Sequence, residues 1–145
     1  MEGSHNVKRI LVIEDELHIS QLIAYNLAEA GYQTATAFDG AEALAQIEHF
    51  APHLITLDLL LPLRSGWEVL GLIRKHPRQQ IATLPVIVLS ALRSPQLQAD
   101  LRLSGVEHCL GKPFSVTELC FLVRSTLDKP HDTNWANPLY IGLRL

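Results

Sequence analysis

Four short apolar runs of this 145-residue chain each lead to side chains that could do chemistry. In chain order these side chains are Glu14, Asp15, Glu16, Asp58, Ser90 and Lys112. Each one taken alone is equally compatible with a structural role. Acidic residues are favoured at a helix N-terminus, Asp and Ser cap turns and helices, and a single lysine is commonly a surface charge.

Together, the same residue types indicate phosphoryl transfer. Clustered carboxylates without histidine or cysteine favour a hard cation such as Mg²⁺, which typically binds one or two carboxylates and keeps several waters. A lysine supplies a point charge for a phosphoryl group, a serine hydroxyl donates a hydrogen bond to it, and a carboxylate can be the nucleophile. The sequence therefore suggests transfer onto Asp58, with the cation neutralising charge on the transferred group.

Hydrophobic periodicity predicts five strands that alternate with five helices. The expected strands are 10–13, 32–37, one in the apolar run that begins at 54 and contains Asp58, 84–89 and 106–110, and the expected helices are about 17–30, 41–51, 67–76, 95–104 and 115–127. Around Pro77 we expect only a turn and a polar stretch. Expected helix N-caps are Asp39, Ser94 and Ser115. Strict alternation is typical of a doubly wound parallel α/β sheet with helices on both faces, where ligands lie outside the carboxyl ends of the strands.

The apolar run that contains Asp58 is typical of a strand buried on both faces of a parallel sheet. Because Asp is disfavoured inside strands and rarely buried without a partner, we expect Asp58 where this strand ends. On this stretch alone, an Asp58 that caps the turn before Pro62 is an equally good interpretation. The polar ends of the other three strands favour a site, because the fold brings all these ends to one edge.

Composition argues against several classes of function. The net charge is −3, the isoelectric point is about 6.1 and the 12 Lys and Arg residues are scattered, so we expect no nucleic acid to bind to this chain itself. No apolar run reaches the roughly 20 residues that span a bilayer, and the N-terminus lacks the apolar core of a signal peptide. We therefore expect no membrane association and a cytoplasmic location. Cys109 and Cys120 lie eleven positions apart, and we expect isolated buried thiols.

The length is typical of a single domain. We expect this folded domain at 7–128, preceded at 1–6 by an N-terminal extension or the remnant of an expression tag. Residues 129–145 break the alternation and are expected to form a C-terminal tail or linker. Apolar side chains in this tail, such as Trp135 and Tyr140, leave docking onto the domain as an open alternative.

At its strand ends the sequence resembles the receiver domain of bacterial two-component response regulators. The segments that carry the resemblance are Ile10–Glu16, Leu57–Pro62 with Gly66, Val88–Ala91 and Lys112–Phe114. They stand in the order and at the spacing of that family, and the likeness covers roughly residues 7–128. The resemblance implies a flavodoxin-like sheet with strand order 2-1-3-4-5.

The resemblance also implies a role for each carboxylate. Asp58 would accept the phosphoryl group from the phosphohistidine of a sensor histidine kinase or a phosphotransfer protein. Asp58 and Asp15 would bind Mg²⁺ directly, Glu14 would assist through water, and the backbone carbonyl of Leu60 would be a further ligand. The protein would be a signalling phosphoacceptor that controls an output protein or effector domain. It would not be an enzyme beyond slow Mg²⁺-dependent self-phosphorylation and self-dephosphorylation.

Two further residues would read the phosphoryl group. Lys112 would contact it, and Ser90 would move to report its presence. The sequence departs from the family three residues before the lysine, where Cys109 stands in place of the usual switch aromatic. The usual coupled motion of hydroxyl and aromatic ring is therefore not expected in its ordinary form.

The Glu14-Asp15-Glu16 triplet is similar to the subfamily that carries winged-helix DNA-binding domains. In that subfamily a homodimer forms through a charged face, which here would comprise the helix at 95–104, the strand at 106–110 and the helix at 115–127. Leu122 stands at a usually basic position of this face, which weakens the resemblance there.

Two alternatives remain beside the signalling interpretation. A phosphohydrolase could use Asp58 as a covalent nucleophile, but such enzymes usually carry an acid/base Asp two residues later, where this chain has Leu60. The domain could also bind a partner without being phosphorylated, an alternative that the atypical Cys109 motivates.

Overall fold

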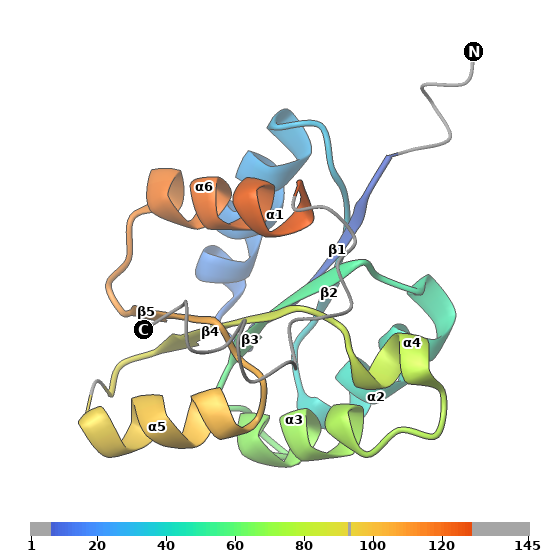
Figure 1. The fold of residues 1–145 in the computed structure, drawn as a ribbon. Helices are drawn as coiled ribbons and strands as arrows, with labels where there is room; N and C mark the ends of the chain where they lie inside the picture. Colours follow the sequence, from blue (N-terminus) through green and yellow to red (C-terminus); the bar gives the residue numbers. More distant parts are fainter. Residues whose placement is uncertain (1–6, 93, 129–145) are drawn as a thin grey trace.

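The computed structural model describes residues 7–92 and 94–128 and contains a five-stranded parallel sheet (Figure 1). The strand order is β2-β1-β3-β4-β5, which confirms the predicted flavodoxin-like topology. The strands are β1 (Arg9–Ile13), β2 (Gln33–Ala37), β3 (Leu54–Asp58), β4 (Val86–Ser90) and β5 (His108–Gly111). The expectations for residues 1–6 and 129–145 lie outside the described residues.

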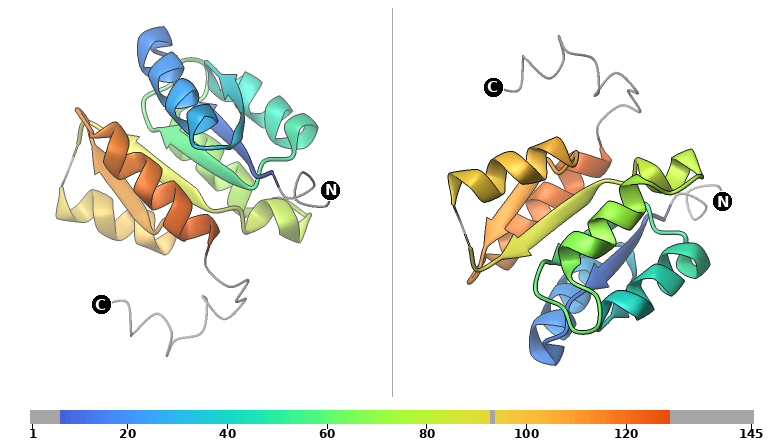
Figure 2. Two further views of the ribbon diagram at one scale, coloured as in Figure 1. Left: turned by 90° about the horizontal axis from the view of Figure 1, so that it is seen from above. Right: turned by 90° about the horizontal axis from the view of Figure 1, so that it is seen from below.

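Helices cover both faces of the sheet, as predicted. They are α1 (Leu17–Glu29), α2 (Gly40–Phe50), α3 (Gly66–Arg74), α4 (Gln79–Ala82), α5 (Pro95–Leu103) and α6 (Val116–Leu127). Figures 1 and 2 show α1 and α6 on one face and the other four helices on the opposite face. Within the described residues, we find no helix that is both long and apolar enough to cross a membrane.

The central strands are apolar on both sides because each face packs against a helical layer. Along β1, Ile10 and Val12 belong to the buried cluster under α1 and α6. Leu11 and Ile13 belong to the second buried cluster, which the other helices cover. Every residue of β3, including Asp58 at its end, is buried. This double burial accounts for the near-continuous apolar runs in the sequence.

The expected N-caps form. The side chains of Asp39, Ser94 and Ser115 each accept a hydrogen bond from the backbone N–H three residues later. Such caps satisfy one of the N–H groups that a helix start leaves without an intrahelical partner. Because all of these helices run antiparallel to the strands they follow, their capped starts lie at the carboxyl edge of the sheet, next to the candidate residues.

One expectation about the elements is wrong and another is confirmed. The segment after Pro77 contains the helix α4, which is only four residues long and buries only Ile81, so that no helical periodicity marks it in the sequence. The strand β3 ends at Asp58, which confirms the expected position of this residue, and the leucines that follow lie outside the strand. Leu60 is 68% exposed, so apolar character there does not reflect burial.

Candidate functional site

Strand register brings Glu14 and Asp58 to the same edge of the sheet. β1 and β3 are parallel neighbours, with Ile13 opposite Leu57. Glu14 follows β1 directly and Asp58 is the last residue of β3. The next pair in the register is therefore two acidic side chains at the carboxyl edge, where parallel α/β sheets bind ligands.

Ser90 and Lys112 reach the same edge from the other side of β3. Ser90 ends β4 and lies opposite Gly111, the last residue of β5. The N–H of Lys112 donates a hydrogen bond to the Ser90 carbonyl over 2.8 Å, which continues the strand pairing by one residue. The edge thus collects polar side chains from four of the five strands.

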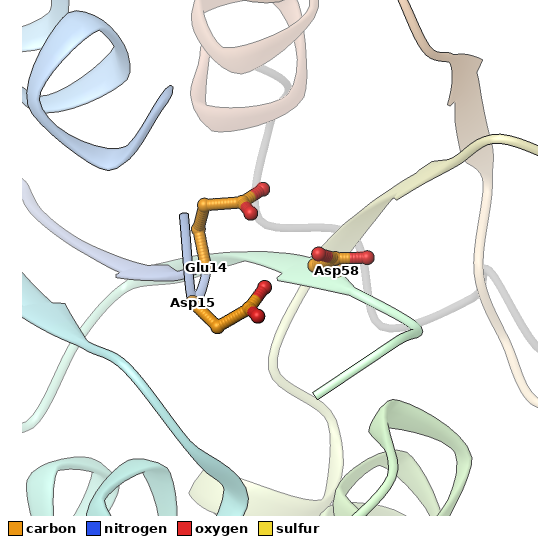
Figure 3. Close-up of side chains that lie close together, drawn as sticks. All are labelled: Glu14, Asp15 and Asp58. Carbon is orange, nitrogen blue, oxygen red and sulfur yellow. The ribbon is translucent and has the colours of Figure 1, made fainter. Parts of the chain in front are cut away.

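Three carboxylates form an acidic cluster at this edge. One oxygen each from Glu14, Asp15 and Asp58 lie within 4.8 Å of one another, and the side chains converge on a common space (Figure 3). Glu14 and Asp58 are only 1% and 4% exposed, whereas Asp15 is exposed. Oxygen donors this close, with one open side, suit a hard divalent cation that keeps some of its waters.

Lys112 links two of these carboxylates. Its ammonium nitrogen lies 2.9 Å from Glu14 Oε1 and 3.1 Å from Asp58 Oδ2. Burial alone would lower the pKa of Lys112, but hydrogen bonds to both carboxylates outweigh it and raise the pKa. Burial raises the pKa of Glu14, the hydrogen bond from Lys112 opposes this rise, and the charge of Asp58 adds to it.

The second oxygen of Asp58 has a separate partner. Its Oδ1 accepts a hydrogen bond from the backbone N–H of Leu60 over 3.0 Å. This is the turn-capping arrangement that the sequence left open beside a functional role. One oxygen of Asp58 thus shapes the turn before Pro62, while the other faces Lys112.

Ser90 and Cys109 do not belong to the cluster of three carboxylates. The Ser90 hydroxyl accepts a hydrogen bond from the Leu92 N–H over 3.0 Å, so it shapes the loop that leads into α5. Cys109 lies opposite Val88 within the sheet and packs against the buried cluster on the α5 face. Cys120 packs against the cluster on the other face. Both thiols are half-buried, so the prediction of buried thiols is wrong in degree.

A family model for the response regulator receiver domain matches residues 10–124. The chain belongs to this family. The strand order and the likeness to solved receiver domains agree with this assignment. As a receiver domain, the chain takes part in two-component signalling, in which phosphorylation by a histidine kinase is typical of the family.

The receiver domain is similar to parts of longer curated proteins. It is 40% identical over 119 residues to "DNA-binding dual master transcriptional regulator RpaA" of Synechocystis, covering 82% of this chain and 48% of that protein. It is also 40% identical over 121 residues to "Alkaline phosphatase synthesis transcriptional regulatory protein PhoP" of Bacillus subtilis, covering 83% and 48%. The chain thus spans about half the length of these relatives, whose names agree with the predicted subfamily.

Solved structures give the same result. The receiver domain of the Francisella response regulator 1452 is 36% identical, with a TM-score of 0.75, and the match covers 81% of this chain and 94% of that one. The chemotaxis response regulator CheY4 of Vibrio cholerae is 28% identical, with a TM-score of 0.76, covering 83% and 98%. The match therefore extends over nearly the whole of two solved receiver domains.

Sequence reasoning missed one residue of this receiver domain that lies next to the candidate site. The sequence predicts a helix cap at Asp39 and assigns Gly40 no role at the site, yet Gly40 lies against the loop that follows Asp58. The signal in the sequence was a glycine at the first position of a capped helix, where alanine has the better helix propensity. A glycine in such a place can mark a close backbone approach.

Proposed function

We propose that this receiver domain accepts a phosphoryl group on the carboxylate of Asp58. An Asp58 oxygen attacks the phosphorus of a phosphohistidine, the P–N bond breaks, and its electron pair returns to the imidazole, which takes up a proton. One observation carries the proposal: a carboxylate that is 4% exposed lies at a strand end, 3.1 Å from an ammonium group. The nucleophile and a cation for the transferred charge are side by side before the donor arrives.

Two donors would assist the transfer, one at the phosphoryl group and one at the Asp58 carboxylate. Lys112 already contacts Asp58 Oδ2, so a short movement would bring its ammonium group to a phosphoryl oxygen. The Leu60 N–H donates to Asp58 Oδ1 and keeps the carboxylate in a fixed orientation for attack. Fixed donors of this kind stabilise charge in the transition state without reorganising at the moment of reaction.

Mg²⁺ would be held by Asp15, Asp58 and the carbonyl of Leu60, with Glu14 acting through water. Three carboxylates face one lysine, so the cluster carries two uncompensated negative charges when all are ionised, and a divalent cation would balance them. When bound, the ion neutralises charge on the transferring phosphoryl group. The burial that raises the pKa of Glu14 also favours a cation here, because a cation offsets the cost of a buried carboxylate.

The phosphoryl group would be reported through the loop between β4 and α5. The Ser90 hydroxyl would exchange its bond to the Leu92 N–H for one to a phosphoryl oxygen, which would free Leu92, a side chain that is 64% exposed. Because Cys109 replaces the usual aromatic, the relay would depend on this loop and not on a ring. Such a switch is a population shift between two conformations.

The partners follow from the family and from the proposed chemistry. A sensor histidine kinase or a phosphotransfer protein would be the donor, which implies a cytoplasmic location, where ATP-dependent kinases act. An effector domain or output protein would respond, in keeping with relatives of which the matched region makes up 48%. A homodimer would use α5, α6 and the edge strand β5.

Acetyl phosphate with Mg²⁺ tests the acceptor directly. We expect intact mass spectrometry to find one phosphoryl adduct on the wild-type protein, none on Asp58→Asn, and little when EDTA removes the metal. Asp100→Asn is the matched control, because it makes the same substitution on α5, away from the cluster, and keeps the adduct. An equal adduct on Asp58→Asn, or none on the wild type, would contradict the proposal.

Two further assays on this protein test the alternative functions, a phosphohydrolase and a binding module that does not need phosphorylation. A phosphohydrolase would turn over a generic phosphoester, and we expect only slow loss of its own phosphoryl group, because the acid/base position holds Leu60. If the domain were a binding module independent of phosphorylation, the Asp58→Ala variant would bind the partner as well as the wild type does. We expect that substitution to change partner binding.

A further inference from the structure

Gly40 lies in direct contact with the loop that follows Asp58. It is the first residue of α2, and its N–H donates a hydrogen bond to the Pro62 carbonyl over 3.3 Å. A Cβ atom at position 40 would lie 2.3 Å from Arg64 Cβ and 2.6 Å from the Arg64 carbonyl oxygen. These distances are far below van der Waals contact and one of them involves backbone, so any side chain here would push the two segments apart.

The loop, and not the helix, would yield to such a push. The start of α2 is fixed by the Asp39 cap and by buried Ala43 and Ile47. The loop carries Leu63, which is 80% exposed and has a φ of 67°, a left-handed conformation that is costly for a leucine. A segment that is exposed and already strained has little packing to hold it in place.

The displacement would be transmitted to Leu60. The Pro62 carbonyl accepts from the N–H groups of both Gly40 and Arg64, so it joins the loop to the helix. Proline has a fixed φ, and the residue before it is restricted to extended conformations. The chain from Pro62 back to Leu60 is therefore stiff. Because Asp58 holds the Leu60 N–H, a shift of Pro62 would turn the peptide group that contains the Leu60 carbonyl.

We propose that Gly40 is a positioning residue for the metal site, because its missing side chain lets the loop after Asp58 keep the backbone conformation in which the Leu60 carbonyl would bind the cation. The inference rests on the proposed function, in which that carbonyl is a metal ligand. Gly40 lies on α2 and not at a strand end, so it would set the affinity for the cation without contacting the cation.

Two other glycines provide matched controls for Gly40→Ala. Gly71 lies within α3, and a Cβ there would meet nothing within 4 Å. Gly31 also has open space, but its φ of +102° makes an alanine strained, at the end of α1 away from the cluster. Gly71→Ala thus controls for the substitution itself, and Gly31→Ala controls for a loss of stability that leaves the site intact.

The experiment measures cation binding and stability separately. Mn²⁺ serves as a substitute for Mg²⁺, with the free ion followed by electron paramagnetic resonance, and urea unfolding in EDTA gives the stability of the metal-free protein. We expect Gly40→Ala to raise the Mn²⁺ dissociation constant by about tenfold or more. We expect Gly31→Ala to lose stability but to keep the Mn²⁺ dissociation constant within about twofold of wild type. We expect Gly71→Ala neither to lower the stability nor to raise the dissociation constant.

The outcomes distinguish a failure of the proposed role of Gly40 from a failure of the proposed metal site. If the wild type binds Mn²⁺ and Asp15→Asn does not, the metal site stands, and an unchanged dissociation constant for Gly40→Ala would then overturn the role of Gly40 alone. The same conclusion follows if Gly31→Ala weakens Mn²⁺ binding as much as Gly40→Ala does. If wild type and Asp15→Asn bind Mn²⁺ equally weakly, the proposed metal site itself is wrong.

Discussion

The two edges of the sheet hold their buried charges in opposite ways. At the carboxyl edge, Glu14 and Asp58 share the single ammonium group of Lys112. At the amino edge, the guanidinium of Arg74 donates to neutral carbonyls, including that of Ser104 over 2.6 Å. The half-buried Arg9 does the same at the end of α2, where its Nε donates to the carbonyls of Phe50 and of the C-cap residue Ala51.

The charged groups at the amino edge have a structural role, whereas those at the carboxyl edge fit a functional site. Carbonyls at helix C-termini carry partial negative charge, so an arginine there satisfies them and leaves nothing further to bind. At the carboxyl edge the acidic groups outnumber the lysine, and the surplus charge suits the cation that we propose. Perturbed, incompletely balanced groups of this kind tend to gather at functional sites. The comparison predicts metal-independent effects at one edge and metal-dependent effects at the other.

The largest effect on stability is expected at the amino edge. Arg74→Met would leave the carbonyls of Ser104, Ala82 and Leu84 without the guanidinium donor that now lies 2.6 to 3.0 Å away. Leaving buried acceptors unpaired in this way costs about 3 kcal/mol in the free energy of unfolding. Urea denaturation should give the same loss with and without Mg²⁺.

Arg78→Met is the matched control for this substitution. Arg78 is exposed and pairs with Glu48 on the surface, so we expect a loss below about 1 kcal/mol. A loss of similar size for the two variants, or an Arg74→Met effect that Mg²⁺ reverses, would break the distinction between the edges.

A smaller and metal-dependent effect is expected for Lys112→Met. Without the ammonium group, Glu14 and Asp58 lose their shared partner, and the metal-free protein should lose about 2 kcal/mol in urea denaturation. Added Mg²⁺ should restore most of this loss and bind about tenfold more tightly than to the wild type, because a more negative cluster attracts the cation more strongly. The exposed Lys75→Met should change stability by less than about 0.5 kcal/mol at any Mg²⁺ concentration.

Thr56 lies between the two edges and is a buried polar residue whose hydroxyl has neither a charged side chain nor a backbone group as its partner among the described residues. It lies in the middle of β3, is 1% exposed, and its hydroxyl has no hydrogen-bond partner among the described residues. Thr56→Val keeps the shape of the side chain and removes the unpaired hydroxyl, so we expect a gain of about 1 kcal/mol in the free energy of unfolding. A loss of stability would show that the hydroxyl is satisfied after all.

The smallest effect is a pH dependence at the amino edge. Burial lowers the pKa of His53 below its usual 6.5, with help from the charges of Arg9 and Lys8. Its Nδ1 accepts a hydrogen bond from the Arg9 N–H over 2.9 Å, which requires the neutral ring. This contribution is complete above pH 6.5 and is lost as the pH falls through the lowered pKa. His53→Asn should therefore lose less stability than the wild type between neutral and mildly acidic pH, measured by urea denaturation.

The sequence was sufficient for the fold because its signals are local and agree with one another. Alternating strands and helices and the right-handed crossover rule predict a doubly wound parallel sheet, and the resemblance to the receiver family implies its strand order. The same rule places Asp58 and Lys112 at one edge without any knowledge of distances. The four residues of α4 could not be predicted, because they are too few for a helical period.

The finer structure of the site depends on contacts that no local pattern encodes. Lys112 and Glu14 are 98 positions apart, and their hydrogen bond requires the register of three intervening strand pairs. The close approach of Gly40 to Arg64 likewise depends on how a helix start and a loop meet. The exposure of Leu60 could not be predicted either, since apolar character alone does not distinguish a buried residue from an exposed one.

The central claim is that Asp58 carries the phosphoryl group. Reduction of the phosphorylated protein with borohydride converts an acyl phosphate on aspartate to homoserine, and peptide mass spectrometry locates it. We predict homoserine at position 58 in the wild type, dependent on both acetyl phosphate and Mg²⁺. Homoserine at position 15 or elsewhere, or none in a protein that binds the cation, would contradict the account.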